Sequence, residues 1–441
     1  VYTQSRKMTE LITIWAGKRL GRKADAIASY RAGFLPEDRR ALETRLTEGS
    51  LLGVISTSAL ELGIDIGNLD ICILVGFPGS IMATRQRAGR VGRGNRESLI
   101  ILVGHEDAMD QHFMRNPDDF FNREVEQVVI NPDNPFIAKQ HLACAAAEIP
   151  LTREDPLHRQ HTDLLEQLTL DSTLLRSADG STWFSTRTYP QREVDLRGSG
   201  KQFLILDKPT RQPLGTLDSL RAMKECHAGA IYLHMAKTWH VDRLDLDARE
   251  VLVSRVSPNY FTRVSVRKEI EIVRVVHSKG FAETRVHFGH LRVTEHITGY
   301  RKVQTGTMKT LAKYPLDFPP QIFETQGLWL EIPEQVQQQL VAGKLHFMGG
   351  IHALEHAMIG VMPLVVLCDR NDIGGISHPW HEQLQGSAVF IYDGYSGGMG
   401  LCEKAYAQFS RLMEQTRATV TECGCDIGFP SCVPVSYTHL T

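Results

Sequence analysis

The sequence lacks any segment that would place it in or across a membrane. None of its 441 residues belongs to an apolar run of about 18 residues, the length at which a membrane-spanning helix is expected. A basic and then apolar leader is also missing from its start, so secretion is not expected. The first residue is Val1 rather than Met, and we expect the sequence to be a fragment that begins inside a domain.

An excess of charge of either sign is missing as well. The chain has 49 Lys and Arg against 51 Asp and Glu, for a net charge of -2. The overall field therefore does not indicate nucleic acid, and any such binding must come from local patches. Cysteine is sparse in most of the chain, but five of the eight cysteines lie within residues 368–432. That distribution favours a metal site in a reducing compartment over a disulfide framework.

Two parts of a complete nucleotide-hydrolysing motor are missing too. The nearest match to a phosphate-binding loop is GSGKQ at residues 198–202. Asp195 stands where that motif has its first glycine, and Gln202 replaces the Ser or Thr after its lysine. No Asp-Glu dipeptide occurs, so the acid pair that holds Mg²⁺ is absent. By itself the chain is expected not to hydrolyse ATP.

Two polar motifs each follow an apolar run that is typical of a buried parallel strand. STSALELGID at residues 56–65 follows the run 51–55, and QRAGRVGRG at residues 86–94 follows the run 71–75. An isolated Arg/Gly run is as often a solvated loop as a phosphate site. The two motifs in this order favour a site, because guanidinium groups on glycine-flanked backbone stabilise a transferring phosphoryl group.

These motifs, with YRAGFLPEDRR at residues 30–40, resemble motifs V and VI of superfamily 2 helicases. They are closest to the bacterial MrfA-type, or YprA-like, DNA helicases. The resemblance implies the C-terminal part of a cytoplasmic, nucleoid-associated, ATP-dependent DNA helicase with 3′-to-5′ polarity and a setting in DNA repair. Its implied cofactor is ATP with Mg²⁺, shared with a first RecA-like domain, and its implied partners are single-stranded DNA with a flanking duplex and a repair nuclease. The fragment alone should not unwind DNA. The alternatives are a nonenzymatic, zinc-dependent nucleic-acid-binding module and an RNA helicase.

The resemblance also assigns roles at the nucleotide. Arg90 and Arg93 would contact the γ-phosphate, and Gln86 would position the attacking water. Gly63 with Asp65 would sense the nucleotide. Because Arg90 and Arg93 are three residues apart, they are expected to face one side of a helical turn.

A second set of residues is assigned to the nucleic acid. Thr57 and Ser58 would link closure of the ATP site to a grip on the DNA backbone. Ser5 and Arg6, at the turn after the first strand, match a motif that holds a phosphate. Taken alone, Ser5 is equally well explained as a helix N-cap.

The apolar pattern divides an α/β chain into four domains. After residue 126 the pattern predicts two helices followed by a pair of strands. This order suggests a winged helix, with a linker bundle of helices as the alternative. The expected domains are a second RecA-like parallel-sheet helicase domain (1–125), a winged-helix-like module (126–195), a strand-rich basic DNA-contacting domain (196–310) and a C-terminal α/β zinc-binding domain (311–433), followed by a non-native tail (434–441).

The strand-rich domain carries a surplus of positive charge. Residues 251–310 hold eleven Lys and Arg against four Glu, with Tyr260, Phe261, Phe288 and Tyr300 interspersed. This pattern suits a groove that tracks phosphates and stacks bases on aromatic rings. A solvated sheet face with core aromatics is the alternative.

The last cysteines resemble the family's zinc motif C-x-C-x-x-G-C-P-S-C. Cys423, Cys425 and Cys432 map onto it, but Phe429 replaces the remaining cysteine. Zn²⁺ needs four ligands. Cys402, Cys368 or a nearby histidine would complete the site, unless the site is defective or Phe429 is a sequence error. Free structural thiols remain the alternative.

Residues 351–359 are expected to form a helix, with an apolar strand at 364–367. On that helix His352 and His356 are four residues apart, with Glu355 before the second. This is not the HExxH order of a metalloprotease, and two buried, hydrogen-bonded histidines are the favoured interpretation over a metal pair.

Overall fold

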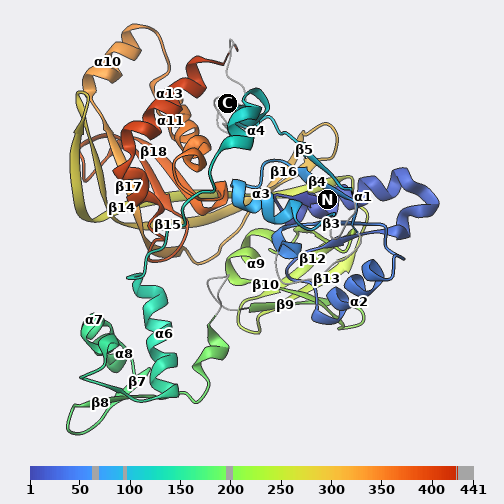
Figure 1. Ribbon diagram of the computed structural model, residues 1–441, viewed down its shortest axis with the longest axis horizontal. Coiled ribbons are helices and arrows are strands. Elements are labelled where there is room, and N and C mark those ends of the chain that lie inside the picture. The colour runs from blue at the N-terminus through green and yellow to red at the C-terminus, as the bar shows by residue number, and fades with distance from the viewer. Residues whose placement is uncertain (62–68, 93–96, 195–201, 424, 426–441) are drawn as a thin grey trace.

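A computed structural model describes residues 1–61, 69–92, 97–194, 202–423 and 425, except the side chain of Glu193. Four β-sheets organise this part of the chain (Figure 1). Within it, no helix is long and apolar enough to cross a membrane.

The first sheet is parallel throughout, as predicted for the N-terminal domain. Its strand order is β2-β3-β1-β4-β5, and the inner strands are buried by helices on its faces. The strands are β1 (Tyr2–Thr3), β2 (Ile27–Tyr30), β3 (Gly53–Ser56), β4 (Ile71–Val75) and β5 (Leu99–Val103). The helices are α1 (Arg6–Leu20), α2 (Pro36–Thr47), α3 (Ile81–Ala88), α4 (Ala108–Arg115) and α5 (Pro117–Asn122).

The next module projects from the rest of the molecule in Figure 1. Its helices pack around Leu165, Leu174 and Trp183 against a small antiparallel sheet of order β6-β8-β7. The elements are α6 (Pro135–Glu148), β6 (Leu151–Thr152), α7 (Pro156–Gln160), α8 (Thr162–Leu170), β7 (Leu174–Arg176) and β8 (Thr182–Ser185). At its entry, the Asn134 side-chain amide donates to the backbone oxygens of Ser396 and Gly398, which ties the module to the C-terminal domain.

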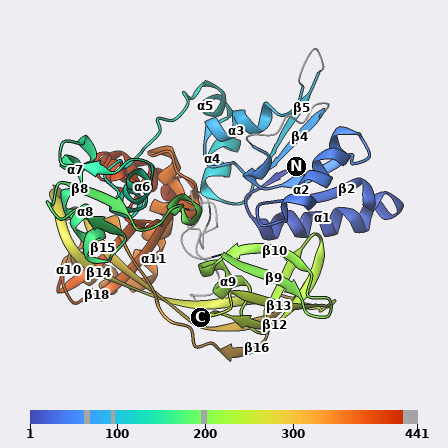
Figure 2. The same ribbon diagram turned by 90° about the horizontal axis from the view of Figure 1, so that it is seen from below.

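A five-stranded sheet follows and lies beside the first sheet, as Figure 2 shows. Its order is β10-β9-β13-β12-β11. The elements are β9 (Gln202–Asp207), β10 (Pro213–Asp218), α9 (Ser219–Glu225), β11 (Ile231–His234), β12 (Lys237–Asp245) and β13 (Glu250–Arg255). The two sheets approach closely, because a Cβ added at Gly215 would lie 2.3 Å from the backbone oxygen of Gly33.

The last sheet is built around a long hairpin, β14 (Tyr260–Phe281) and β15 (Thr284–Gln304). The order β14-β15-β17-β19-β18 is extended by β16, which pairs with β15. The other elements are β16 (Thr310–Pro315), β17 (Gln321–Ile332), α10 (Glu334–Ala342), α11 (Phe347–Val361), β18 (Ile373–His381), β19 (Gly386–Asp393), α12 (Leu401–Ala407) and α13 (Phe409–Thr421).

This sheet corrects the domain boundary that we placed at residue 310. Strand β15 pairs with β17 over ten residue pairs, from Val286↔Leu330 to Glu295↔Gln321, so one sheet runs across the boundary. The region 196–310 is therefore not one domain: residues 202–255 form one sheet, and the hairpin after them belongs to the next. Alternation along a strand identifies the strand but not its partner, which is why the sequence misplaced the boundary.

The strand expected at residues 364–367 is also wrong. Met362–Leu364 is a 3₁₀ turn, and the amide groups of Val365 and Val366 both donate to the backbone oxygen of Met362. Val365 and Val366 are buried in the main core with no strand ladder. A short apolar run has the same sequence pattern in a buried strand and in a buried turn. The sequence therefore could not distinguish a strand from a turn at these residues.

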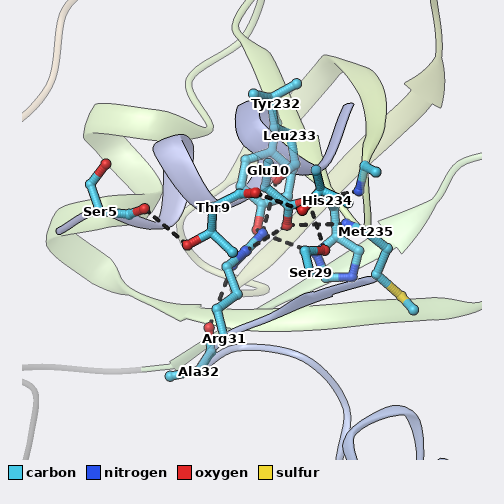
Figure 3. A network of polar contacts seen from close by, with 12 residues as sticks. Ser5, Thr9, Glu10, Ser29, Arg31, Ala32, Tyr232, Leu233, His234 and Met235 are labelled. Atoms are coloured by element: carbon cyan, nitrogen blue, oxygen red, sulfur yellow. Dashed lines mark hydrogen bonds and ion pairs between the residues drawn. The ribbon is translucent and has the colours of Figure 1, made fainter. Parts of the chain in front are cut away.

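A fully buried ion pair joins the first domain to the five-stranded sheet (Figure 3). The Arg31 Nε donates to Glu10 Oε1 at 2.8 Å, and their side chains are 2% and 1% exposed. The Arg31 Nη2 reaches across to the Tyr232 hydroxyl at 3.1 Å and the Leu233 backbone oxygen at 2.9 Å. Buried charges persist where such partners satisfy them.

The same carboxylate holds a strained turn between β11 and β12. Met235 and Ala236 have φ values of +48° and +57°, which non-glycine residues adopt at a cost of about 1–3 kcal/mol each. Their amide groups donate to Glu10 at 3.1 Å and 2.6 Å. Glu10 thus neutralises the charge of the buried guanidinium and offsets the conformational cost of the strained turn. These bonds also attach helix α1 to the neighbouring sheet.

Replacing Glu10 with Gln should destabilise the chain by about 3–5 kcal/mol, because a buried Arg31 would lose its countercharge. Denaturant unfolding followed by circular dichroism measures this loss. The control is Glu48→Gln, at an exposed position after α2, which should change stability by less than about 0.5 kcal/mol. Equal stability of the two variants would show that the pair does not hold the domains.

Candidate nucleotide and nucleic-acid site

The predicted nucleic-acid residues meet at one edge of the parallel sheet. Strand β1 lies next to β3, with Tyr2 opposite Ser56, so the segments that follow both strands leave the sheet at its carboxyl edge. Ser5 follows β1 and is exposed, whereas Thr57 and Ser58 follow β3, half-buried and exposed respectively. In parallel sheets this edge is where ligands bind.

Ser5 also caps helix α1, as the alternative reading expected. Its hydroxyl accepts the Met8 amide hydrogen at 3.2 Å. A cavity of about 300 Å³ opens beside it, lined among others by Gln4, Ser5 and, from the C-terminal domain, Arg370. Our sequence reasoning did not find Arg370, because no motif links it to residues so distant in the chain.

Arg6 lies in a cluster of like charges at the start of helix α1. Burial lowers the pKa of Arg6, and the nearby guanidinium groups of Arg221 and Arg31 lower it further, while Glu225 acts in the opposite direction. Arg31 is paired with Glu10, and Arg221, which comes from a different domain on α9, pairs with Asp218 at 3.5 Å. Positive groups that repel one another are relieved by a bound anion.

Lys7 extends this cluster onto the long hairpin. Burial lowers the pKa of Lys7, Arg263 of β14 lowers it further, and Glu225 opposes both. The Lys7 ammonium lies 4.4 Å from the centre of the Phe261 ring. We call Arg6, Lys7, Arg221 and Arg263 the cationic cluster. Three separate elements thus bring positive charge to the N-terminus of α1, where the helix dipole also favours an anion.

The nucleotide-facing motif ends helix α3. Gln86 is half-buried within the helix, which stops at Ala88, so Arg90 lies in the turn beyond it and not on a continuing helical turn as expected. Gly89 ends the helix, because its backbone leaves the helical conformation there. The Arg90 Nη2 donates to the backbone oxygen of Glu61, which brings the two motifs together. Their contact supports one shared site.

Arg87, which the sequence reasoning missed, anchors this arrangement. It is buried and its Nε donates to Glu61 Oε2 at 2.8 Å. The same guanidinium lies 5.5 Å from the centre of the Tyr2 ring. Arg87 therefore stabilises the segment that carries Glu61 and is not available to a nucleotide. Arg93, Gly63 and Asp65 lie outside the described residues, and their roles stay predictions.

The basic surface predicted on the hairpin is neutralised only in part, because three of its eleven basic residues, Arg267, Lys268 and Arg292, form ion pairs with glutamates in the described part of the chain. Lys268 donates to the Tyr392 hydroxyl at 2.9 Å and pairs with Glu295 at 3.6 Å. Arg292 pairs with two glutamates, each at 2.8 Å. Phe288 and Tyr300 are only 3% and 8% exposed, so they are core residues and not stacking platforms. Arg263 of β14 is the member of this surface that contributes to the cationic cluster.

The cysteine pair is arranged as zinc ligands would be. The Cys423 and Cys425 sulfurs lie 3.4 Å apart, close to the roughly 3.8 Å separation of two thiolates on one tetrahedral Zn²⁺. Cys432 and Phe429 lie outside the described residues. Cys368 and Cys402 are buried in the main core, where burial raises the pKa of both thiols. Among the described side chains no third ligand joins the pair. Cys423, Cys425 and Cys432 would hold Zn²⁺, which stabilises such a fold.

Three family profiles match parts of the chain. Residues 1–95 match the helicase conserved C-terminal domain, residues 130–199 the winged helix domain of the ATP-dependent helicase HRQ1, and residues 354–433 the MrfA Zn-binding domain. The winged-helix prediction is thereby confirmed, and the third profile spans the cysteine pair.

Whole-chain relatives agree with these profiles. The uncharacterized ATP-dependent helicase YprA of Bacillus subtilis is 33% identical over 98% of this chain and 58% of its own length. The ATP-dependent helicase hrq1 of Schizosaccharomyces pombe is 29% identical over 95% of this chain and 41% of its own length. The chain therefore spans about half the length of the curated relatives that it matches.

Solved structures show the same arrangement. The crystal structure of the helicase MrfA bound to DNA superposes with a TM-score of 0.68 at 32% identity, and covers 98% of this chain and 58% of that one. Its complex with DNA and AMPPNP gives a TM-score of 0.67 at 31% identity, with the same coverage. The parallel sheet of the first domain is thus RecA-like.

Cys425→Ser should lower the zinc content of the purified chain by about one ion, because a zinc–thiolate site needs all its ligands. Atomic absorption on dialysed protein measures this content. The buried Cys226, in the core of the five-stranded sheet, is the control: Cys226→Ala should leave zinc unchanged. Unchanged zinc in the Cys425 variant would contradict the site.

Proposed function

Because the chain belongs to the MrfA-type, YprA-like family of superfamily 2 helicases, we propose that it forms the second motor domain and the DNA-gripping part of an ATP-dependent DNA helicase. The observation that carries the proposal is the cationic cluster beside Ser5. Its members Arg6 and Lys7 lie on the same RecA-like domain as the arginine motif, so this domain would contact both the nucleotide and the nucleic acid.

At the nucleotide, Arg90 and Arg93 contact the γ-phosphate, and Gln86 positions the attacking water. Gly63 and Asp65 sense whether the nucleotide is bound. The contact of Arg90 with Glu61 supports this assignment, because it places the arginine turn against the motif that contains those two residues. ATP with Mg²⁺ would bind between this domain and a first RecA-like domain, and charge stabilisation by the arginines would accelerate phosphoryl transfer.

At the nucleic acid, Ser5, Arg6, Thr57 and Ser58 hold backbone phosphates of one strand. The exposed edge that these residues share supports this grip, and backbone contacts carry no base information. Closure of the ATP site would shift the domain along the strand, and repetition of the cycle would move it in the 3′-to-5′ direction that the family implies. We place the activity in DNA repair at the bacterial nucleoid in the cytoplasm, on single strands with a flanking duplex and beside a repair nuclease.

Arg6→Ala combined with Arg221→Ala should weaken binding of a single-stranded oligonucleotide whatever its sequence. Each lost phosphate contact should also reduce the salt slope of the binding constant by about 0.7. Fluorescence anisotropy across a salt series measures both. Arg19→Ala, at the exposed far end of α1, is the matched control and should bind like the parent.

An unchanged salt slope in the double variant would contradict the proposed grip. Matched DNA and RNA oligonucleotides in the same assay separate a DNA helicase from an RNA helicase. Tighter binding of RNA would favour the latter.

Arg90→Ala or Arg93→Ala should each lower DNA-stimulated ATP turnover by about 10³-fold or more, in the full-length protein that supplies the first RecA-like domain. A coupled ATPase assay measures turnover. Arg85→Ala, an exposed position on α3, is the control and should retain activity. Near-normal turnover in both test variants would overturn the assignment of these arginines to the γ-phosphate.

A further inference from the structure

Helix α11 directs three potential metal ligands to one point, away from the sites described above. His352, Glu355 and His356 each place one ligating atom within 4.8 Å of the other two. Their spacing puts all three on one face of the helix.

The separations match those of ligands on one ion. The His352 Nδ1 lies 3.2 Å from Glu355 Oε2, close to the roughly 3.3 Å between two ligand atoms that share a tetrahedral Zn²⁺. The two imidazole rings are 4.5 Å apart between centroids and nearly perpendicular, at 82°. The potential ligand atoms of both rings and of the carboxylate nevertheless lie within 4.8 Å of one another.

The fold reserves space for this carboxylate. Glu355 is 4% exposed and packs against β18, where a Cβ at Gly375 would lie 2.8 Å from its Oε1. Any side chain at position 375 would displace it. Ser377, two residues along the same face of the strand, places its Oγ 3.3 Å from the His352 Nδ1 and so lies at the edge of this group.

Burial of this carboxylate requires positive charge nearby. Lys268 contributes to its field, since Glu355 is among the groups that raise the pKa of Lys268 against the effect of burial. The Lys268 ammonium itself, however, donates to Tyr392 and pairs with Glu295. A cation bound between the two histidines would supply charge directly at the carboxylate.

We propose that His352, Glu355 and His356 bind one divalent transition-metal ion of the Zn²⁺ class, with a fourth position for water or an added ligand. Two imidazoles and a carboxylate suit Zn²⁺ and exclude a thiolate-selective site. The group of three does not include Cys423 or Cys425, and the proposal does not depend on the proposed helicase function. A pair of hydrogen-bonded histidines, favoured by the sequence, is the competing account.

Cobalt is the probe that separates the two metal sites. In a Cys423→Ser/Cys425→Ser/Cys432→Ser chain stripped with chelator, added Co²⁺ should bind one equivalent with visible d–d absorption but no sulfur-to-metal charge-transfer band. Adding His356→Gln should abolish this absorption. His346→Asn is the control, because His346 caps the same helix but is not one of the three ligands, and it should retain the absorption.

Absence of d–d absorption in the cysteine-free chain, or its persistence with His356→Gln, would overturn the proposal. If His356→Gln does not fold, thermal unfolding takes its place. Co²⁺ should raise the melting temperature of the cysteine-free chain. No shift with Co²⁺ would also reject the site.

Discussion

The arrangement of the domains depends on one buried ion pair, between Glu10 and Arg31. Both residues belong to the RecA-like domain, but the bonds they make extend to the backbone of the five-stranded sheet. The Glu10 side chain is only 1% exposed. Removing either partner would leave a buried, unpaired charge and would greatly lower the free energy of unfolding. The pair also holds the strained turn at Met235. The two domains are therefore expected to move together.

This constraint gives helix α1 two functions along one length. Its first residues, Arg6 and Lys7, contribute to the cationic cluster, and Glu10, one turn later, locks the helix to the next domain. Arg221 approaches the cluster from that domain, and Arg263 approaches it from the hairpin β14–β15. The hairpin β14–β15 then runs from the cluster to the zinc-binding domain (Figure 1), so a change at the nucleotide has a continuous route to the distal sheet.

The sequence was informative wherever function is written in a local motif. The parallel sheet, the positions of Ser5 and Thr57 at its edge, and the paired cysteines all follow from short patterns. Contacts between distant residues were not predictable. Arg31 and Tyr232 are 201 positions apart in the sequence, and no local pattern in either segment indicates that the two residues are in contact. The same limit explains the misplaced boundary at 310 and the aromatic rings of Phe288 and Tyr300, which local alternation could not assign to a core. The end of α3 before Arg90 was missed because Gly89 terminates the helix within the motif.

Photochemical cross-linking of the chain to a single-stranded oligonucleotide with reactive groups on its backbone tests the central claim most directly, with the attached peptides identified by mass spectrometry. The account predicts cross-links to the start of α1, to α9 and to the first residues of β14, the three elements that supply the cationic cluster. Cross-links confined to the winged-helix module, with none on these elements, would contradict it.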